Sequence, residues 1–124
     1  MVKGLEHTAI ASPDPQKLAQ WYVEHLDFTI NYNSGRTVFV KAPNGYMLEI
    51  ITAEGQRGPQ TMKDPGLRHL AVAVDDLDTV YNRLKGQGVE FQSEPVTNKG
   101  VRTVFFSDPD GNYLHLLQRE IPLP

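Results

Sequence analysis

The chain contains no cysteine, so it can form neither a disulfide nor a thiolate metal site, and it has no thiol nucleophile. Any metal ion would have to be held by histidine and carboxylate side chains. No apolar run approaches the roughly 20 residues that a membrane span requires, and no hydrophobic signal segment follows the N-terminus. We therefore expect a soluble, cytoplasmic protein that does not bind membranes.

The chain also has no segment in which charges of one sign are clustered. The formal net charge is -3, and acidic and basic residues are interspersed along the chain. Nucleic-acid binding usually needs clustered lysine and arginine, so we expect no nucleic-acid partner. At 124 residues with 40% hydrophobic residues, the chain is long enough to bury one core, and we expect a single domain spanning 1–124.

What the chain does contain is an internal repeat. Three blocks of the first half recur in the same order in the second half: Gly4–Ala11 as Gly66–Ala73, Arg36–Phe39 as Arg102–Phe105, and Pro43–Glu49 as Pro109–His115. The separation changes from 62 to 66 residues between the first and second blocks, which indicates one insertion of four residues. The repeat predicts two modules, residues 4–52 and 66–119, joined by a linker rich in Gly and Pro at residues 53–65.

Each module has the pattern of one strand, one helix and three further strands, which predicts an α+β fold. In the first, Asp14 and Pro15 form a helix start, and Asn44-Gly45 is a hairpin turn signal. We predict helices over 15–25 and 77–86. The predicted strands cover 4–11, 28–30, 36–41 and 46–52 in the first module, and 67–74, 89–92, 101–107 and 112–119 in the second.

Histidine placement points to a metal site. Three of the four histidines lie within apolar strands, where His7 and His69 occupy equivalent positions and Glu49 and His115 occupy another equivalent pair. A lone histidine in a strand is more often a hydrogen-bonded residue than a ligand. Here, however, the repeat relates the four side chains by symmetry, and burying such groups without partners is costly. Three imidazoles and one carboxylate suit a divalent ion.

The remaining polar and aromatic residues are assigned structural roles. His25 falls near the end of the first helix, where a cation suits the helix dipole. Arg36 and Arg102 are interpreted as solvated strand ends rather than as contacts for an anionic substrate. Five aromatic residues are expected in the core rather than in a pocket: Trp21, Phe28, Phe39, Phe105 and Tyr113.

The chain resembles the vicinal oxygen chelate superfamily, the glyoxalase, bleomycin-resistance and extradiol-dioxygenase group. The residues that carry the resemblance are Leu5–Ile10, Trp21–Phe28, Leu67–Val72 and Asp108–Leu116. It implies two β-α-β-β-β modules whose mixed sheets curve around a central cavity. It also implies a divalent metal ion (Zn, Ni, Co, Fe or Mn), a small-molecule substrate chelated through adjacent oxygens, and a homodimer.

The resemblance assigns the metal ligands one by one. His7 falls on the first-strand ligand of the first module, Glu49 on the ligand that closes this module, and His69 on the first-strand ligand of the second. His115 falls on the last ligand, which is usually Glu in the family. This departure moves the role of proton-transfer base to Glu49. A second departure is Asp27, which replaces the usual Gly after the first helix and which we expect to alter only the turn.

Fold alone does not determine reaction. The leading hypothesis is a metal-dependent lyase or isomerase of the glyoxalase I type with Glu49 as the catalytic residue. An extradiol-type Fe(II) dioxygenase is the alternative, since two histidines and a carboxylate suit Fe(II). A non-catalytic antibiotic-binding protein is a third possibility, against which the ligand set counts. The four ligands come either from one chain or from two chains in a swapped dimer.

Overall fold

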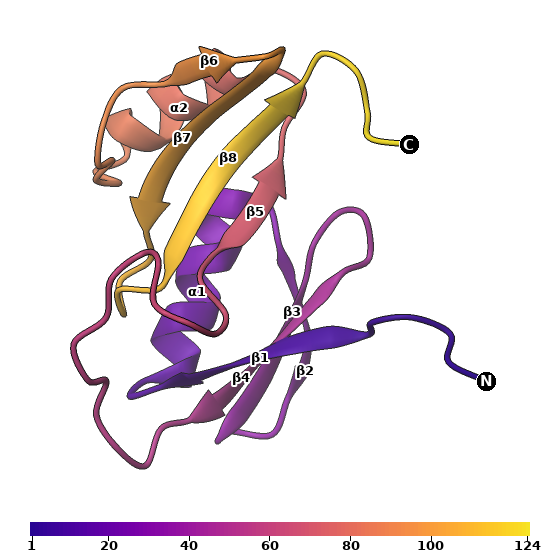
Figure 1. Ribbon diagram of the computed structural model, residues 1–124. Helices are drawn as coiled ribbons and strands as arrows, with labels where there is room; N and C mark the ends of the chain where they lie inside the picture. The colour runs from indigo at the N-terminus through magenta and orange to yellow at the C-terminus, as the bar shows by residue number, and fades with distance from the viewer. The chain divides into compact units, whose positions relative to one another are not determined.

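The computed structural model describes residues 1–124 and divides into two compact units, Met1–Gly58 and Pro59–Pro124 (Figure 1). We describe each unit by itself. None of the helices has the length and apolar character needed to cross a membrane.

The first unit contains one helix and a four-stranded mixed sheet. In chain order its elements are β1 (His7–Ser12), α1 (Pro15–Leu26), β2 (Thr29–Asn33), β3 (Thr37–Lys41) and β4 (Met47–Thr52). The strands are ordered β1-β4-β3-β2, with β1 parallel to β4 and the other pairs antiparallel.

The second unit repeats this arrangement. Its elements are β5 (Leu70–Ala73), α2 (Leu77–Gly86), β6 (Val96–Asn98), β7 (Val101–Ser107) and β8 (Tyr113–Arg119). The strands are ordered β5-β8-β7-β6, and only the pair of β5 with β8 is parallel. The predicted pair of β-α-β-β-β modules is therefore confirmed.

Local sequence explains where α1 begins and ends. The Asp14 side chain accepts a hydrogen bond from the Lys17 N–H at 3.1 Å, and Pro15 occupies the first helical turn, where its missing N–H is not needed. At the other end Asp27 adopts a left-handed conformation with φ of 61°. Aspartate tolerates this region better than most residues, so it terminates the helix in place of glycine.

One face of each sheet packs against the helix of the same unit, and this is where the core lies. In strands β3, β4, β7 and β8 the buried residues alternate with less buried ones, as side chains on successive positions point to opposite faces. The core residues of the first unit include Leu18, Tyr22, Val38, Val40, Leu48 and Ile50; those of the second include Leu77, Leu84, Val104, Phe106, Leu114 and Leu116. We call the opposite, less buried side of each sheet its open face.

The first strand of each module begins later than predicted. Gly4 and Gly66, which the repeat equates, have φ of 134° and 112°, outside the region of extended strands for other residues. The strands start at His7 and Leu70 rather than at residues 4 and 67, so His69 lies just before β5 and not within it.

The predicted strand over 89–92 is wrong. Phe91 makes only an isolated bridge to Phe106, and the edge strand of the second sheet is Val96–Asn98. Gly88, just after the helix cap Gln87, adopts φ of 88°. The Val89 N–H donates a hydrogen bond to the Leu84 carbonyl at 3.0 Å. The chain therefore remains tied to the end of the helix here and reaches the sheet edge only after Pro95.

Candidate metal centre

In the first unit His7 and Glu49 lie together on the open face. His7 begins β1, and Glu49 lies in β4 opposite Ala9, two residues further along the same face of β1. The His7 Nε2 atom is 3.5 Å from Glu49 Oε1, and the two side chains are 34% and 27% exposed. An imidazole and a carboxylate thus lie side by side and partly exposed on one face of the sheet.

Glu6 is a functional candidate that the sequence interpretation missed. Its Oε1 atom lies 2.9 Å from the other ring nitrogen of His7, Nδ1. With Nδ1–H donating to this carboxylate, the lone pair of the neutral ring is on Nε2, the nitrogen that faces Glu49. Metal-binding histidines commonly have a carboxylate partner of this kind, which fixes the tautomer and the ring orientation. An acidic residue directly before a candidate ligand was the available signal.

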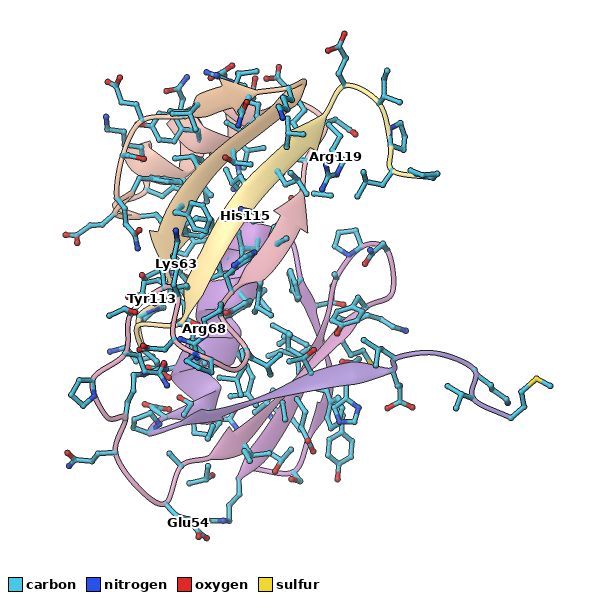
Figure 2. The ribbon with its side chains drawn as sticks, viewed as in Figure 1. Glu54, Lys63, Arg68, Tyr113, His115 and Arg119 are labelled. Atoms are coloured by element: carbon cyan, nitrogen blue, oxygen red, sulfur yellow. The ribbon has the colours of Figure 1, made fainter.

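In the second unit His69 and His115 form the corresponding pair. Their ring centroids are 4.5 Å apart with an interplanar angle of 55°. Figure 2 labels His115 on β8, with Arg119 further along the same strand. The Nδ1 atom of His115 is buried and has no hydrogen-bond partner. Buried polar atoms in folded proteins are almost always hydrogen-bonded. No group of the folded chain bonds to this nitrogen, so it is available to an external ligand such as a metal ion.

The electrostatics of His115 favour its neutral form. Burial lowers the pKa of His115 below its usual range, and the nearby His69 and Arg119 lower it further. A neutral imidazole keeps a lone pair for a metal ion, whereas a protonated one is a donor at both nitrogens.

Two phenylalanines flank the histidine pairs, and their expected place in the core is wrong. Phe39 pairs with Glu49 across β3 and β4, and Phe105 pairs with His115 across β7 and β8. Phe39 meets His7 edge to face at 5.3 Å, and Phe105 meets His69 in the same way at 5.6 Å. Phe39 shares its face with Thr37 and Lys41, and Phe105 shares its face with Thr103 and Ser107, so alternation favours the opposite face as the core although the two rings are apolar.

Arg102 and His25 both have contacts within their own unit, although Arg102 is ion-paired and is not the solvated strand end that we expected. Arg102 makes a bidentate ion pair with Asp78 of α2, with nitrogen–oxygen distances of 2.8 and 3.2 Å, and this pairing raises its pKa. It therefore serves the packing of its own unit. His25, the fourth histidine, lies against Trp21 at a ring-centroid distance of 5.3 Å, near the end of α1.

The donor chemistry fits a divalent ion, with two candidate ligands in each unit. In neither unit do three or more His, Cys, Asp or Glu side chains gather into a complete metal site. The first unit supplies one imidazole and one carboxylate, and the second supplies two imidazoles. Together these are the nitrogen and oxygen donors that Zn, Fe, Co and Ni accept.

The family model of the Glyoxalase/Bleomycin resistance protein/Dioxygenase superfamily matches residues 4–116. The chain belongs to this superfamily. Its members typically use divalent metal ions and bind small molecules with adjacent oxygens. They include lyases, dioxygenases, fosfomycin-resistance enzymes and antibiotic-binding proteins, so membership narrows the chemistry without selecting one reaction.

Relatives of nearly equal length were found in two bacteria. The chain is 32% identical to the uncharacterized protein YaeR of Escherichia coli (strain K12), with 95% of this chain and 98% of YaeR covered. It is 30% identical to the uncharacterized protein YwkD of Bacillus subtilis (strain 168), with 96% of this chain and 99% of YwkD covered. Among solved structures, Oxidase ChaP-H2 is similar with a TM-score of 0.77 and 28% identity, covering 96% of this chain and 95% of that one.

Proposed function

We propose that the protein is a metal-dependent lyase or isomerase of the glyoxalase I type, with His7, Glu49, His69 and His115 as ligands of a divalent ion. The observation that carries the proposal is the unpartnered, buried Nδ1 atom of His115 beside His69. The matching pair of His7 and Glu49 on the open face of the other unit supports it. One carboxylate and three imidazoles are donors that such an ion accepts.

When bound, a divalent ion supplies a Lewis acid that polarises two adjacent substrate oxygens. Glu49 is the group that moves the proton, because it is the one carboxylate among the four proposed ligands. Its Oε1 atom is the one beside His7, which leaves Oε2 to take a proton from the substrate carbon and return it to the neighbouring carbon. Phe39 lies directly opposite Glu49 on β3, so its ring lies beside this carboxylate on the open face.

Elemental analysis of protein purified without added metal tests the ligand set. We expect about one divalent ion per set of four ligands in the wild type and a loss of metal in His7→Ala and His115→Ala. His25→Ala is the matched control, because this histidine lies at the end of α1 and should leave the metal content unchanged. Absence of metal, with no uptake of Ni, Co, Zn, Fe or Mn, would refute the proposal.

The proposed reaction is tested by hemithioacetal isomerisation and by deuterium exchange from solvent into candidate 2-hydroxy acids and ketones. We expect Glu49→Gln to retain a chelated ion through its other ligands and to lose proton exchange by at least about 100-fold, the usual contribution of a general base. Exchange at the wild-type rate in this variant would remove Glu49 from the role of base.

A dioxygenase is the second candidate. It is favoured by similarity to biphenyl-2,3-diol 1,2-dioxygenase 2 of Rhodococcus globerulus, which is 23% identical over 89% of this chain and 60% of its own length. His7 and Glu49 with one further histidine would provide the two-histidine, one-carboxylate set of Fe(II) oxygenases. Oxygen consumption with catechol by the iron-loaded protein would favour this reaction. Tight binding of a flat antibiotic by metal-free protein would instead favour a sequestering role.

We further propose a homodimer, since superfamily members often form dimers. The two ligand pairs of one site come either from one chain or from two. Mixing the His7→Ala and His115→Ala variants distinguishes these arrangements. In a swapped dimer the mixed species contains one intact site and one site with both substitutions, so mixing restores metal binding. If each chain holds its own site, mixing restores none.

A further inference from the structure

Tyr32 is a large aromatic residue exposed on the edge strand β2. The residue is 55% exposed. Its one aromatic contact is with Phe39, at a centroid distance of 5.9 Å and an interplanar angle of 83°. Burial in the core therefore does not account for this residue.

A bulge in β2 places Tyr32 on the open face. Ile30 pairs with Val40 of β3, but the next pair joins Tyr32 to Phe39, so Asn31 is the extra residue. Val40 is buried on the face that packs against α1, whereas Phe39 lies on the open face. Since directly opposed residues share a face, Ile30 and Tyr32 point to opposite faces although they are two positions apart. A regular strand would have directed Tyr32 towards the face of the helix.

The bulge is not a requirement of the fold. The equivalent edge strand of the second unit, β6, pairs with β7 in regular register and contains no aromatic residue. The first unit thus has an aromatic side chain on its open face that the repeat does not demand.

Tyr32 is connected to the proposed ligands by a continuous row of rings. Tyr32 contacts Phe39 at 5.9 Å, Phe39 contacts His7 at 5.3 Å, and His7 lies 3.5 Å from the carboxylate of Glu49. The row begins with an exposed hydroxyl, continues as an apolar wall and ends at the metal ligands. A ligand that contacts the whole row needs two neighbouring oxygens at the metal ligands, a flat apolar body against Phe39, and a polar group that reaches the Tyr32 hydroxyl.

We propose that Tyr32 is a specificity-determining residue that positions a planar, aromatic or enolic substrate chelated through two adjacent oxygens. The rings of Tyr32 and Phe39 pack against the flat body, and the Tyr32 hydroxyl hydrogen-bonds to its distal polar group. This inference rests on the proposed metal-dependent function and selects among its substrates, since only a substrate with a flat body and a distal polar group would contact both Phe39 and Tyr32.

Two chelators test the proposal with the full-length, metal-loaded protein. Both 4-nitrocatechol and acetohydroxamate chelate through neighbouring oxygens, but only 4-nitrocatechol has a flat ring with a distal polar group. Binding of 4-nitrocatechol is followed by its visible absorbance, and acetohydroxamate is measured by its displacement. Metal content is determined for every variant, so that loss of the ion is not mistaken for loss of the wall.

We expect Tyr32→Ala to weaken 4-nitrocatechol binding by about 2- to 10-fold and to change acetohydroxamate binding by less than about twofold. Tyr32→Phe should retain part of the affinity through its ring. Ile30→Ala is the matched control, because it truncates an exposed side chain on the other face of the same strand.

The possible failures are distinguishable. If wild-type protein binds both chelators and Tyr32→Ala binds 4-nitrocatechol with unchanged affinity, the role of Tyr32 is refuted and the metal site stands. An equal loss in Tyr32→Ala and Ile30→Ala would also refute it, since the effect would then be general to the strand. If neither chelator binds the loaded wild type, the proposed metal-dependent function fails and this inference fails with it.

Discussion

Replacement of His115 by leucine should stabilise the metal-free protein and at the same time remove its stabilisation by metal. The Nδ1 atom of His115 is buried without a hydrogen-bond partner. An unsatisfied buried polar group is destabilising by about 1–3 kcal/mol. Leucine has a similar volume and no polar atom, and it would pack against Phe105, whose ring centroid lies 4.7 Å from that of His115.

The substitution changes the free energy of unfolding in opposite directions for the metal-free and the metal-bound protein. Because the His115 side chain as a whole is only partly buried, we take the lower end of that range, about 1 kcal/mol. For a domain of this size this corresponds to a rise in Tm of about 3–6 °C. A divalent ion at about 100 times its dissociation constant would stabilise the wild type by about 2.7 kcal/mol. The order of stability should therefore reverse when metal is added.

The assay is thermal unfolding followed by circular dichroism, in chelator and then with excess divalent ion, for wild type and for His115→Leu. His25→Leu is the control, because it removes a histidine outside the proposed site and should leave the gain in Tm on metal addition unchanged.

Two results would contradict the reasoning. If His115→Leu unfolds at a lower temperature than the wild type in chelator, the unpartnered nitrogen is not a source of instability. If the ion raises the Tm of the variant as much as that of the wild type, His115 is not a ligand.

Three further predictions concern the residues around the proposed site and one turn. Glu6→Ala should weaken metal affinity several-fold, because His7 loses the acceptor that orients its ring; isothermal titration calorimetry measures this, and unchanged affinity would exclude the role. The stability of the metal-free protein should be full above the ordinary histidine pKa of about 6.5 and decline as the pH falls below it. The reason is that the lowered pKa of His115 in the folded chain lets the unfolded chain take up the proton first; urea midpoints across this range should be flatter for His115→Leu. Asp108→Ala should destabilise the protein by about 1–3 kcal/mol in urea unfolding, because this buried carboxylate accepts two backbone N–H groups and the Asn112 amide; a loss below about 0.5 kcal/mol would show that water replaces it.

The proposed ligand pairs were predictable because they depend on short-range patterns. Strand alternation predicts His7 and Glu49 on the same face of neighbouring strands, and the repeat extends this expectation to His69 and His115, although His69 lies just before β5. The start of α1 was predictable for a similar reason, since the signals at Asp14 and Pro15 lie next to the end that they define.

The flanking residues were not predictable in this way. Phe39 and Phe105 are large apolar residues, which favours the core, but they share their strand faces with Thr37 and Lys41 and with Thr103 and Ser107. Residue type and alternation therefore indicate opposite faces for these two rings. Only packing against the helix decides which face is buried. Glu6 was overlooked because its significance depends on the orientation of the neighbouring imidazole ring, which sequence does not specify.

By itself, the sequence determined the two-module fold and the four candidate ligands, because periodicity and turn residues are local properties of the chain and the repeat can be read directly from the sequence. Tertiary structure decided the surroundings of those ligands. The bulge at Asn31, the face occupied by Tyr32 and the late edge strand Val96–Asn98 all depend on cross-strand register. Register is set by hydrogen bonds and packing between different segments of the chain, and a shift of one residue reverses the face of every side chain that follows.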